Sequence, residues 1–230
     1  MARECGDAGV QGELLYRIGQ SYHLLGENSR AIALIEKSLE FTAERRARDR
    51  FELSVMPAVV NRTWLVSVLA ECGDFSAGMT HAKRALEIAE EAEHPLSQVL
   101  GWLAVGHLLW RKGELDGAIG ALERGVAICN RHPLPIWRLR LQSLLGVAYA
   151  SCGRVSEGLE LAQQALADAE GRRLVVDQPM FLVHLGQASL LAGRVEDALM
   201  YGNRALKAAS ALEVRGNEAW ARFLIARTRP

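Results

Sequence analysis

Five glycines recur along the chain at a nearly constant interval. Gly26, Gly73, Gly113, Gly153 and Gly193 are separated by 47, 40, 40 and 40 residues. A fixed period of about 20 to 50 residues is typical of repeat proteins, whose units cannot bury their apolar faces alone and must stack on their neighbours. The period therefore predicts a single array that covers the whole chain, and it places function on an extended surface.

Small residues recur at fixed distances on both sides of these glycines. Seven residues before each glycine the chain has Gly19, Val66, Gly106, Gly146 and Gly186. Five residues after each glycine it has Ala31, Gly78, Ala118, Gly158 and Ala198. Because small side chains at a crossing let two helices approach closely, each unit is predicted to be an antiparallel helical hairpin around a glycine turn.

The period also sets the expected bounds of the units. We expect hairpins at about residues 12–45, 52–92, 96–131, 135–171 and 176–211, followed by a terminal helix at about 214–227. In this register Ala226 takes the small position seven residues before a turn that would lie beyond Pro230. The terminal helix is therefore predicted to be the first helix of a sixth hairpin, without its mate.

The pattern of the units resembles the tetratricopeptide repeat. That repeat joins an aromatic residue, Leu-Gly, a second aromatic residue, a turn and an alanine on the second helix. The third unit shows the pattern with Trp102, Val105-Gly106, Gly113 and Ala118. The proline that often closes the shorter repeat of about 34 residues is absent, so the second helix is expected to run on. Such long variants are similar to the helical arrays of bacterial signalling proteins that contain a nucleotide cyclase or a regulatory ATPase.

The resemblance implies an all-α, right-handed α-α superhelix that acts as a non-catalytic scaffold and binds protein or peptide in its concave groove. In this family the first helix of each hairpin lines the groove about ten, six and three residues before the turn glycine. Carried over by position, the groove residues are Tyr16, Gln20, His23, Thr63, Ser67, Leu103, His107, Trp110, Ser143, Val147, Val183 and Gln187.

Two questions about this groove follow from the residue types. A clamp for a peptide carboxylate needs fixed cations, and Tyr16, Gln20, Thr63 and Ser67 supply none. Trp110 either anchors a bound segment, since aromatic side chains contribute much of the binding energy at interfaces, or packs against a neighbouring hairpin. The sequence leaves both roles of Trp110 open.

Composition argues against a nucleic-acid partner. The chain has 27 Lys and Arg against 27 Asp and Glu, so it has no basic excess. The segment 44–50 holds four arginines, and we interpret it as a solvated turn between repeats.

The sequence has no signature of catalysis or of a bound cofactor. It contains no phosphate-binding glycine loop, no dinucleotide motif and no nucleophile elbow. The six histidines never occur at a spacing that would place two of them on one helix face for a metal ion. Carboxylate pairs such as Glu157 and Glu160 are interpreted as a solvated outer face. We therefore expect no enzyme, no cofactor and no metal.

Location and assembly are predicted from what surrounds the repeats. No apolar run is long enough to span a membrane, and residues 1–12 lack the apolar core of a signal peptide. Cys72 and Cys152 lie two repeats apart, so free buried thiols and a cytoplasmic location are expected. Two alternatives to the scaffold remain: a regulatory or ligand-sensing segment of a larger bacterial signalling protein, and a self-association module that forms a homo-oligomer through the terminal helix.

Overall fold

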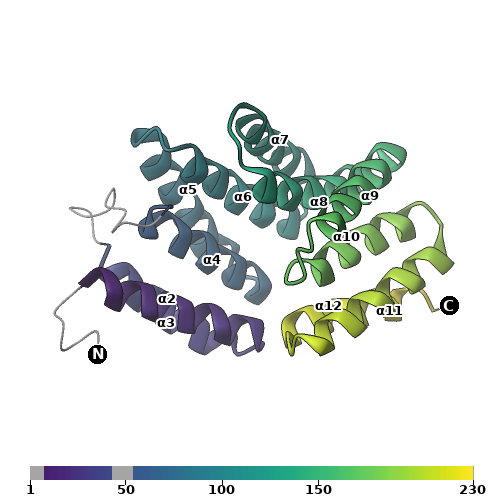
Figure 1. Ribbon diagram of the computed structural model, residues 1–230, viewed down its shortest axis with the longest axis horizontal. Coiled ribbons are helices and arrows are strands. Elements are labelled where there is room, and N and C mark those ends of the chain that lie inside the picture. Colours follow the sequence, from purple (N-terminus) through teal and green to yellow (C-terminus); the bar gives the residue numbers. More distant parts are fainter. Residues whose placement is uncertain (1–7, 43–53, 230) are drawn as a thin grey trace. The chain divides into compact units, whose positions relative to one another are not determined.

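The computed structural model describes residues 8–42 and 54–229. Within these residues the chain forms eleven α-helices and no strand, which confirms the all-α prediction (Figure 1). In chain order they are α2 (Ala8–Leu24), α3 (Asn28–Glu40), α4 (Pro57–Cys72), α5 (Phe75–Glu91), α6 (Pro95–Lys112), α7 (Leu115–Arg131), α8 (Pro135–Ser151), α9 (Val155–Gly171), α10 (Gln178–Leu191), α11 (Val195–Ala211) and α12 (Arg215–Arg227). Cys5 and the arginine-rich segment 44–50 lie outside the described residues.

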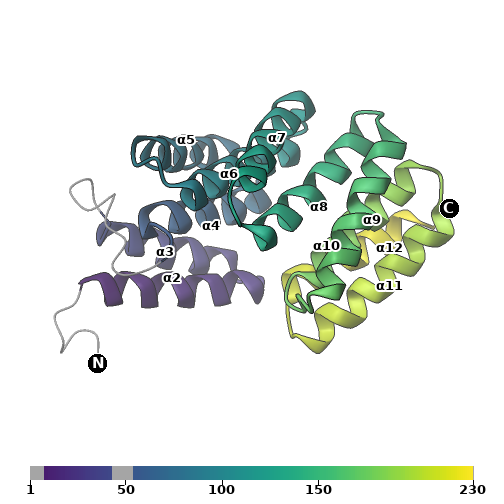
Figure 2. The same ribbon diagram turned by 45° about the horizontal axis from the view of Figure 1, so that its top comes forward.

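The helices belong to two compact units. Helices α2 to α6 lie in the first unit and α7 to α12 in the second. In the first unit α4 packs against α3, α5 and α6. In the second unit α8 packs against α7, α9 and α10, and α10 also packs against α9, α11 and α12 (Figure 2). The organisation of residues 1–230 as one array of five hairpins stays a prediction.

The recurrent glycines form the turns between helices. Gly26, Gly73, Gly113, Gly153 and Gly193 all have a left-handed backbone, with φ between 72° and 94°. The amide of the residue after each glycine donates to the carbonyl five residues before it. Glu114 donates to Leu109 and Arg154 donates to Tyr149 in this way, both at 2.9 Å. This bond ends a helix in the Schellman geometry. Because that backbone costs an L-residue roughly 1–2 kcal/mol, glycine is favoured at each turn.

Prolines mark the starts of the first helices. Pro57, Pro95 and Pro135 are the first residues of α4, α6 and α8, and Pro179 is the second residue of α10. At these positions the fixed φ of proline suits the helix and its missing N–H is not needed. These prolines thus stand at the start of the first helix of a hairpin, whereas the shorter repeat often has a proline at the end of the second helix.

Small residues permit very close helix contacts. In the second unit α8 and α9 cross at Gly146 and Gly158. A methyl group on Gly146 would lie 2.8 Å from the Gly158 carbonyl oxygen, and one on Gly158 would meet the Gly146 carbonyl oxygen and the Ala150 nitrogen. In the first unit a methyl group on Gly19 of α2 would lie 2.7 Å from Cγ1 of Ile35 on α3. At the α8–α9 crossing backbone proximity therefore requires glycine, whereas at Gly19 a side chain of the neighbouring helix fills the space.

The cysteines within the described residues are all free thiols. Cys129 is buried, and burial raises the pKa of its thiol to about 11. Cys72 and Cys152 are exposed. The prediction of buried thiols is therefore wrong for these two cysteines, because the last residue or the cap of a helix next to a turn glycine faces solvent.

Among the helices of residues 8–42 and 54–229, none is long and apolar enough to cross a membrane.

The crossing of α8 and α9 makes a stability prediction. Gly158→Ala should destabilise the protein by about 1–3 kcal/mol, because backbone atoms occupy the space that the methyl group needs. Gly120→Ala, at a helical position of α7 with nothing within 4 Å, is the matched control and should stabilise by about 0.5–1 kcal/mol. Urea unfolding of both variants measures the difference, and equal effects would show that the crossing tolerates a methyl group.

Candidate functional site

The twelve predicted groove residues fall into a buried set and a half-buried set. The buried residues are Tyr16, His23, Thr63, Ser143, Val147, Val183 and Gln187. The half-buried residues are Gln20, Ser67, Leu103, His107 and Trp110. All half-buried members belong to the first unit, and all four predicted residues of the second unit are buried. Access to the predicted positions is therefore restricted to the first unit.

Helix packing accounts for several of the buried positions. The Thr63 hydroxyl lies 3.0 Å from the Val59 carbonyl and 3.3 Å from the Leu100 carbonyl, so it contacts α4 and α6 backbone together. The Ser143 hydroxyl hydrogen-bonds Nδ1 of His184 on α10 at 2.9 Å. Val183 lies in the apolar core of the second unit. The sequence signal for this burial is that α8 and α10 are largely apolar on every side, which is typical of helices surrounded by others.

Four of the five half-buried residues lie on two neighbouring helices of the first unit, α4 and α6, whereas Gln20 lies on α2. We define the α4–α6 face as Ser67, Glu71, Leu103, His107, Trp110 and Arg111. The ring centroids of His107 and Trp110 are 6.2 Å apart, and the Arg111 guanidinium lies 5.6 Å from the centroid of the Trp110 ring. Burial lowers the pKa of Arg111, and the charge of Glu71 opposes that shift. The face thus combines an aromatic anchor with one charge of each sign.

Sequence reasoning missed Glu71 and Arg111. Both stand two residues before a turn glycine, Gly73 and Gly113, so they occupy the same repeat position. This position was not among the three that the family resemblance selects. The sequence signal that would have identified the pair is a charged residue two positions before the turn glycine on both α4 and α6.

His23 lies at the α2 edge of the first unit rather than on an open surface. Its Nδ1 is 3.4 Å from Oδ1 of Asn28 and 3.7 Å from Oε2 of Glu71. Its ring packs edge-on against Trp64 with a centroid distance of 6.2 Å. These contacts connect α2 to α4, so packing accounts for the burial of His23.

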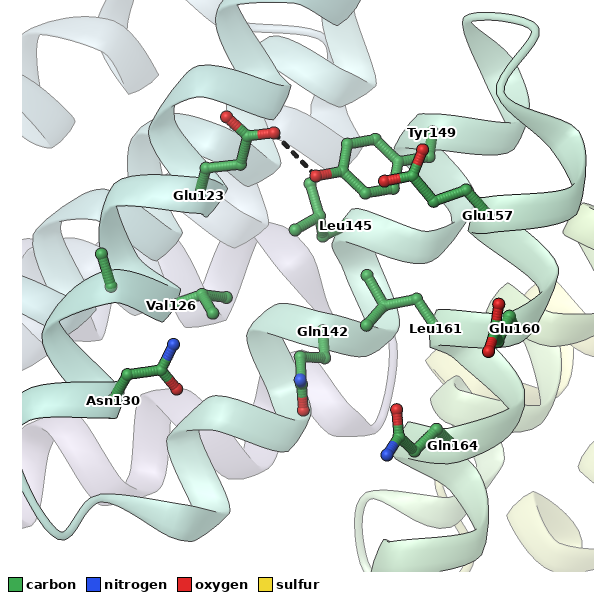
Figure 3. A pocket seen from close by; sticks show the side chains of 11 residues that line it. Glu123, Val126, Asn130, Gln142, Leu145, Tyr149, Glu157, Glu160, Leu161 and Gln164 are labelled. Carbon is green, nitrogen blue, oxygen red and sulfur yellow. Dashed lines mark hydrogen bonds between the residues drawn. The ribbon is translucent and has the colours of Figure 1, made fainter.

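The second unit contains a cavity between α7, α8 and α9 (Figure 3). Its volume is about 380 Å³. The lining residues are Glu123, Val126, Ala127 and Asn130 of α7, Gln142, Leu145 and Tyr149 of α8, and Glu157, Glu160, Leu161 and Gln164 of α9. Its floor is apolar at Leu145, whereas carboxylates and amides stand around it. No sequence argument had assigned these residues to one site, because they come from three helices.

A network of hydrogen bonds closes one end of the cavity. The Tyr149 hydroxyl donates to Oε1 of Glu123 at 2.7 Å. Burial, followed by the hydrogen bond to Glu123, raises the pKa of Tyr149 to about 12. The Arg154 guanidinium lies 3.7 Å from the centroid of the Tyr149 ring and donates two hydrogen bonds to Glu157, at 2.9 and 2.5 Å. These hydrogen bonds are the main cause that raises the pKa of Arg154.

Neither surface has the donors of a metal site. Among residues 8–42 and 54–229, no group of three His, Cys, Asp or Glu side chains could hold a metal ion. The arrangement can instead bind a partner through aromatic, amide and carboxylate groups.

These features place the protein in the class of α-helical repeat scaffolds. Sequence models of the tetratricopeptide repeat match residues 143–213 and residues 12–44. Residues 12–44 and 143–213 of the chain therefore have the sequence of tetratricopeptide repeats, and the comparison supports a tetratricopeptide-repeat protein. No significant match to a curated protein sequence was found.

Solved structures of low sequence identity share the fold. A Rap protein complexed with Competence and Sporulation Factor has a TM-score of 0.66 and 17% identity, over 96% of this chain and 64% of that one. The chain therefore spans less than two thirds of that protein. A tetratricopeptide-repeat protein of Thermus thermophilus has a TM-score of 0.58 and 20% identity, over 92% and 99% of the two chains. A signal transduction ATPase of Pyrococcus horikoshii with a tetratricopeptide repeat sensor has a TM-score of 0.60 and 16% identity, over 93% of this chain and 32% of that one.

The closed end of the cavity makes a titration prediction. Glu123→Gln should lower the pKa of Tyr149 from about 12, while burial keeps it above the ordinary value of about 10. Because the fold favours the neutral phenol, the stability that Tyr149 contributes is complete below about pH 10 and is lost as the pH rises through its folded pKa. A pH titration of the tyrosine ¹³Cζ signals measures the pKa, and Glu160→Gln, in the same cavity, should leave it unchanged.

Proposed function

We propose that the protein is a non-catalytic scaffold that binds a protein or peptide segment on the α4–α6 face. The observation that supports this proposal is the accessibility of the predicted groove residues. Leu103, His107 and Trp110 stand one turn apart along α6 and are half-buried, whereas the four predicted groove residues of the second unit, Ser143, Val147, Val183 and Gln187, are buried. A partner can therefore reach the repeat position that the family uses for binding on α6.

The composition of the face favours a mixed polar and apolar segment. Trp110 and Leu103 offer apolar area, and buried aromatic side chains contribute much of the energy of an interface. Glu71 and Arg111 provide one charge of each sign, so a partner gains no advantage from a large net charge. The proposed mechanism is recognition by shape and by local polar contacts, and it makes or breaks no bond.

The comparisons support the general role and leave the partner open. The tetratricopeptide repeat is generally a non-enzymatic scaffold. The Rap structure contains a bound factor, which is a property of that protein. We take from it only that a solenoid of this fold accommodates a partner, and a cytoplasmic location likewise remains a proposal.

Trp110 is the decisive residue for this proposal. Trp110→Glu should weaken binding at least tenfold, because it replaces aromatic contact area with a charge, whereas Trp110→Tyr should largely retain binding. Peptides selected from a displayed random library on the whole chain provide the ligands, and calorimetry measures their affinities. Unfolding midpoints of both variants should stay near that of the parent protein.

Two results would contradict the proposal. Selected peptides that bind Trp110→Glu as tightly as the parent protein would place binding elsewhere. A large loss of stability in Trp110→Glu would show that Trp110 belongs to the packing between hairpins.

A regulatory role is the first alternative. It is supported by the likeness to the signal transduction ATPase that contains a tetratricopeptide repeat sensor. In that role the repeats would sense a ligand or a sister domain within a larger bacterial signalling protein. A cyclase or ATPase sequence in the same reading frame as this chain would favour it.

Self-association is the second alternative, and a feature of α12 favours it. Ala226 occupies the repeat position of Gly186, yet Ala226 is exposed and Gly186 is buried. On the same helix Phe223 is 49% exposed, and its ring contacts Trp220 at a centroid distance of 5.8 Å. Ala226 and Phe223 thus belong to an exposed surface of α12 to which a second copy can bind.

This alternative makes its own prediction. The mass measured by sedimentation equilibrium should rise with concentration, and Phe223→Glu should return it to that of one chain of 25.2 kDa. Thr80→Glu, at an exposed position of α5, is the control and should not change the mass. A constant mass of one chain for the parent protein would exclude self-association through α12.

A further inference from the structure

We propose that the cavity between α7, α8 and α9 binds an arginine side chain of a partner peptide. This site is separate from the α4–α6 face and does not depend on it. Three features of the cavity favour an arginine: the charge of its wall, the guanidinium of Arg154 beside it, and the polar groups that Arg154 leaves unsatisfied.

The wall of the cavity has a negative charge without a lining cation. Three of its eleven lining residues are glutamates, Glu123, Glu157 and Glu160, and none is Lys, Arg or His. Arg154, beside the cavity, pairs with Glu157 and lies 3.9 Å from Glu123. One cation against three carboxylates leaves two negative charges, so the cavity favours a cationic ligand.

Arg154 shows which cation these groups accommodate. Its guanidinium stacks on the Tyr149 ring and forms a two-pronged contact with the Glu157 carboxylate. A planar fork of donors matches a carboxylate in this way, whereas an ammonium group cannot make both contacts from one plane. One end of the cavity is therefore a guanidinium site that the chain fills itself.

The rest of the lining offers a carboxylate and amides whose acceptors are unsatisfied. Glu160 stands one turn along α9 from Glu157 and has no ion-pair or hydrogen-bond partner within residues 8–42 and 54–229. The amides of Gln142, Gln164 and Asn130 likewise have none there. In Figure 3 Gln142 lies between Asn130 on the α7 side and Gln164 on the α9 side. A guanidinium has five N–H donors, so it can use one carboxylate and several amide oxygens at once.

The floor and size of the cavity suit the rest of an arginine side chain. Leu145 is 4% exposed, and Val126 and Leu161 lie on either side of it on α7 and α9. The methylene groups of an arginine can lie on this apolar floor while the charged head meets Glu160. A volume of about 380 Å³ is at the small end of the range for ligand pockets, which fits one side chain and its backbone better than a large cofactor.

The experiment titrates the complete ¹⁵N-labelled chain with the blocked tripeptide acetyl-Ala-Arg-Ala-amide. We expect saturable shifts of the side-chain amide signals of Asn130, Gln142 and Gln164. The matched tripeptide with citrulline, a neutral analogue of arginine, should bind at least tenfold more weakly, because it lacks the charge. The lysine tripeptide should also bind more weakly than the arginine one.

Two variants test the assigned residues. Glu160→Gln keeps the size of the side chain and should raise the dissociation constant for the arginine tripeptide about tenfold, as expected for one lost charge-assisted hydrogen bond. Glu196→Gln, the same change at an exposed site on α11, should leave it within about twofold. Ala127→Arg, at an exposed lining position, should abolish binding because the new guanidinium competes for the cavity.

Several outcomes would overturn the proposal. They are equal affinity for the arginine and citrulline tripeptides, equal affinity for arginine and lysine, an unchanged affinity in Glu160→Gln, and the absence of shifts at the lining amides. None of these bears on the α4–α6 face, because Trp110 and the tripeptide site lie on different units. Conversely, failure of the Trp110 variants leaves the tripeptide result unaffected.

Discussion

The structure depends on how closely two helices of a hairpin approach one another. At the crossing of α8 and α9 the backbone of Gly158 leaves no room for a methyl group beside Gly146. The turn between these helices is equally constrained, because Gly153 has a φ of 94°. Both requirements act on the backbone, so they select residue types with little tolerance at these positions, and the turn glycine recurs in every hairpin. The regular spacing of the glycines in the sequence thus reflects the repetition of one helical hairpin.

These constraints explain why the fold class follows from the sequence. Turn glycines and small crossing residues act locally, within about ten residues of each turn, so a period in the sequence reports them directly. Burial is a different matter. Ser143 and Val183 occupy repeat positions that the family exposes, yet contacts with residues far away in sequence, such as His184 with Ser143, enclose them. Repeat register fixes where a residue stands on its helix, whereas the neighbours of that helix decide whether solvent reaches it.

The same distinction explains why the cavity was not predicted. Glu157 and Glu160 were interpreted as a solvated outer face, and both are indeed exposed. The sequence of α9 alone does not show that Gln142 of α8 and Asn130 of α7 line the same cavity as these two glutamates. A binding site built from three helices has no motif along the chain. Glu71 and Arg111 are an intermediate case, because their shared repeat position is visible in the sequence once the face is known.

The two surfaces illustrate how a repeat protein can differ from one unit to the next without a change of fold. The α4–α6 face has an aromatic anchor, and the cavity of the second unit has carboxylates and amides around an apolar floor. Beside the cavity Arg154 neutralises Glu157 of α9, and Glu160, one turn further along, has no such partner in the described chain. Because exposed carboxylates are readily solvated, exposure alone would not make Glu160 a binding residue. Its place in the lining of a cavity that also contains the buried Leu145 does, since a cation bound there is partly removed from water and its attraction to the carboxylate is screened less.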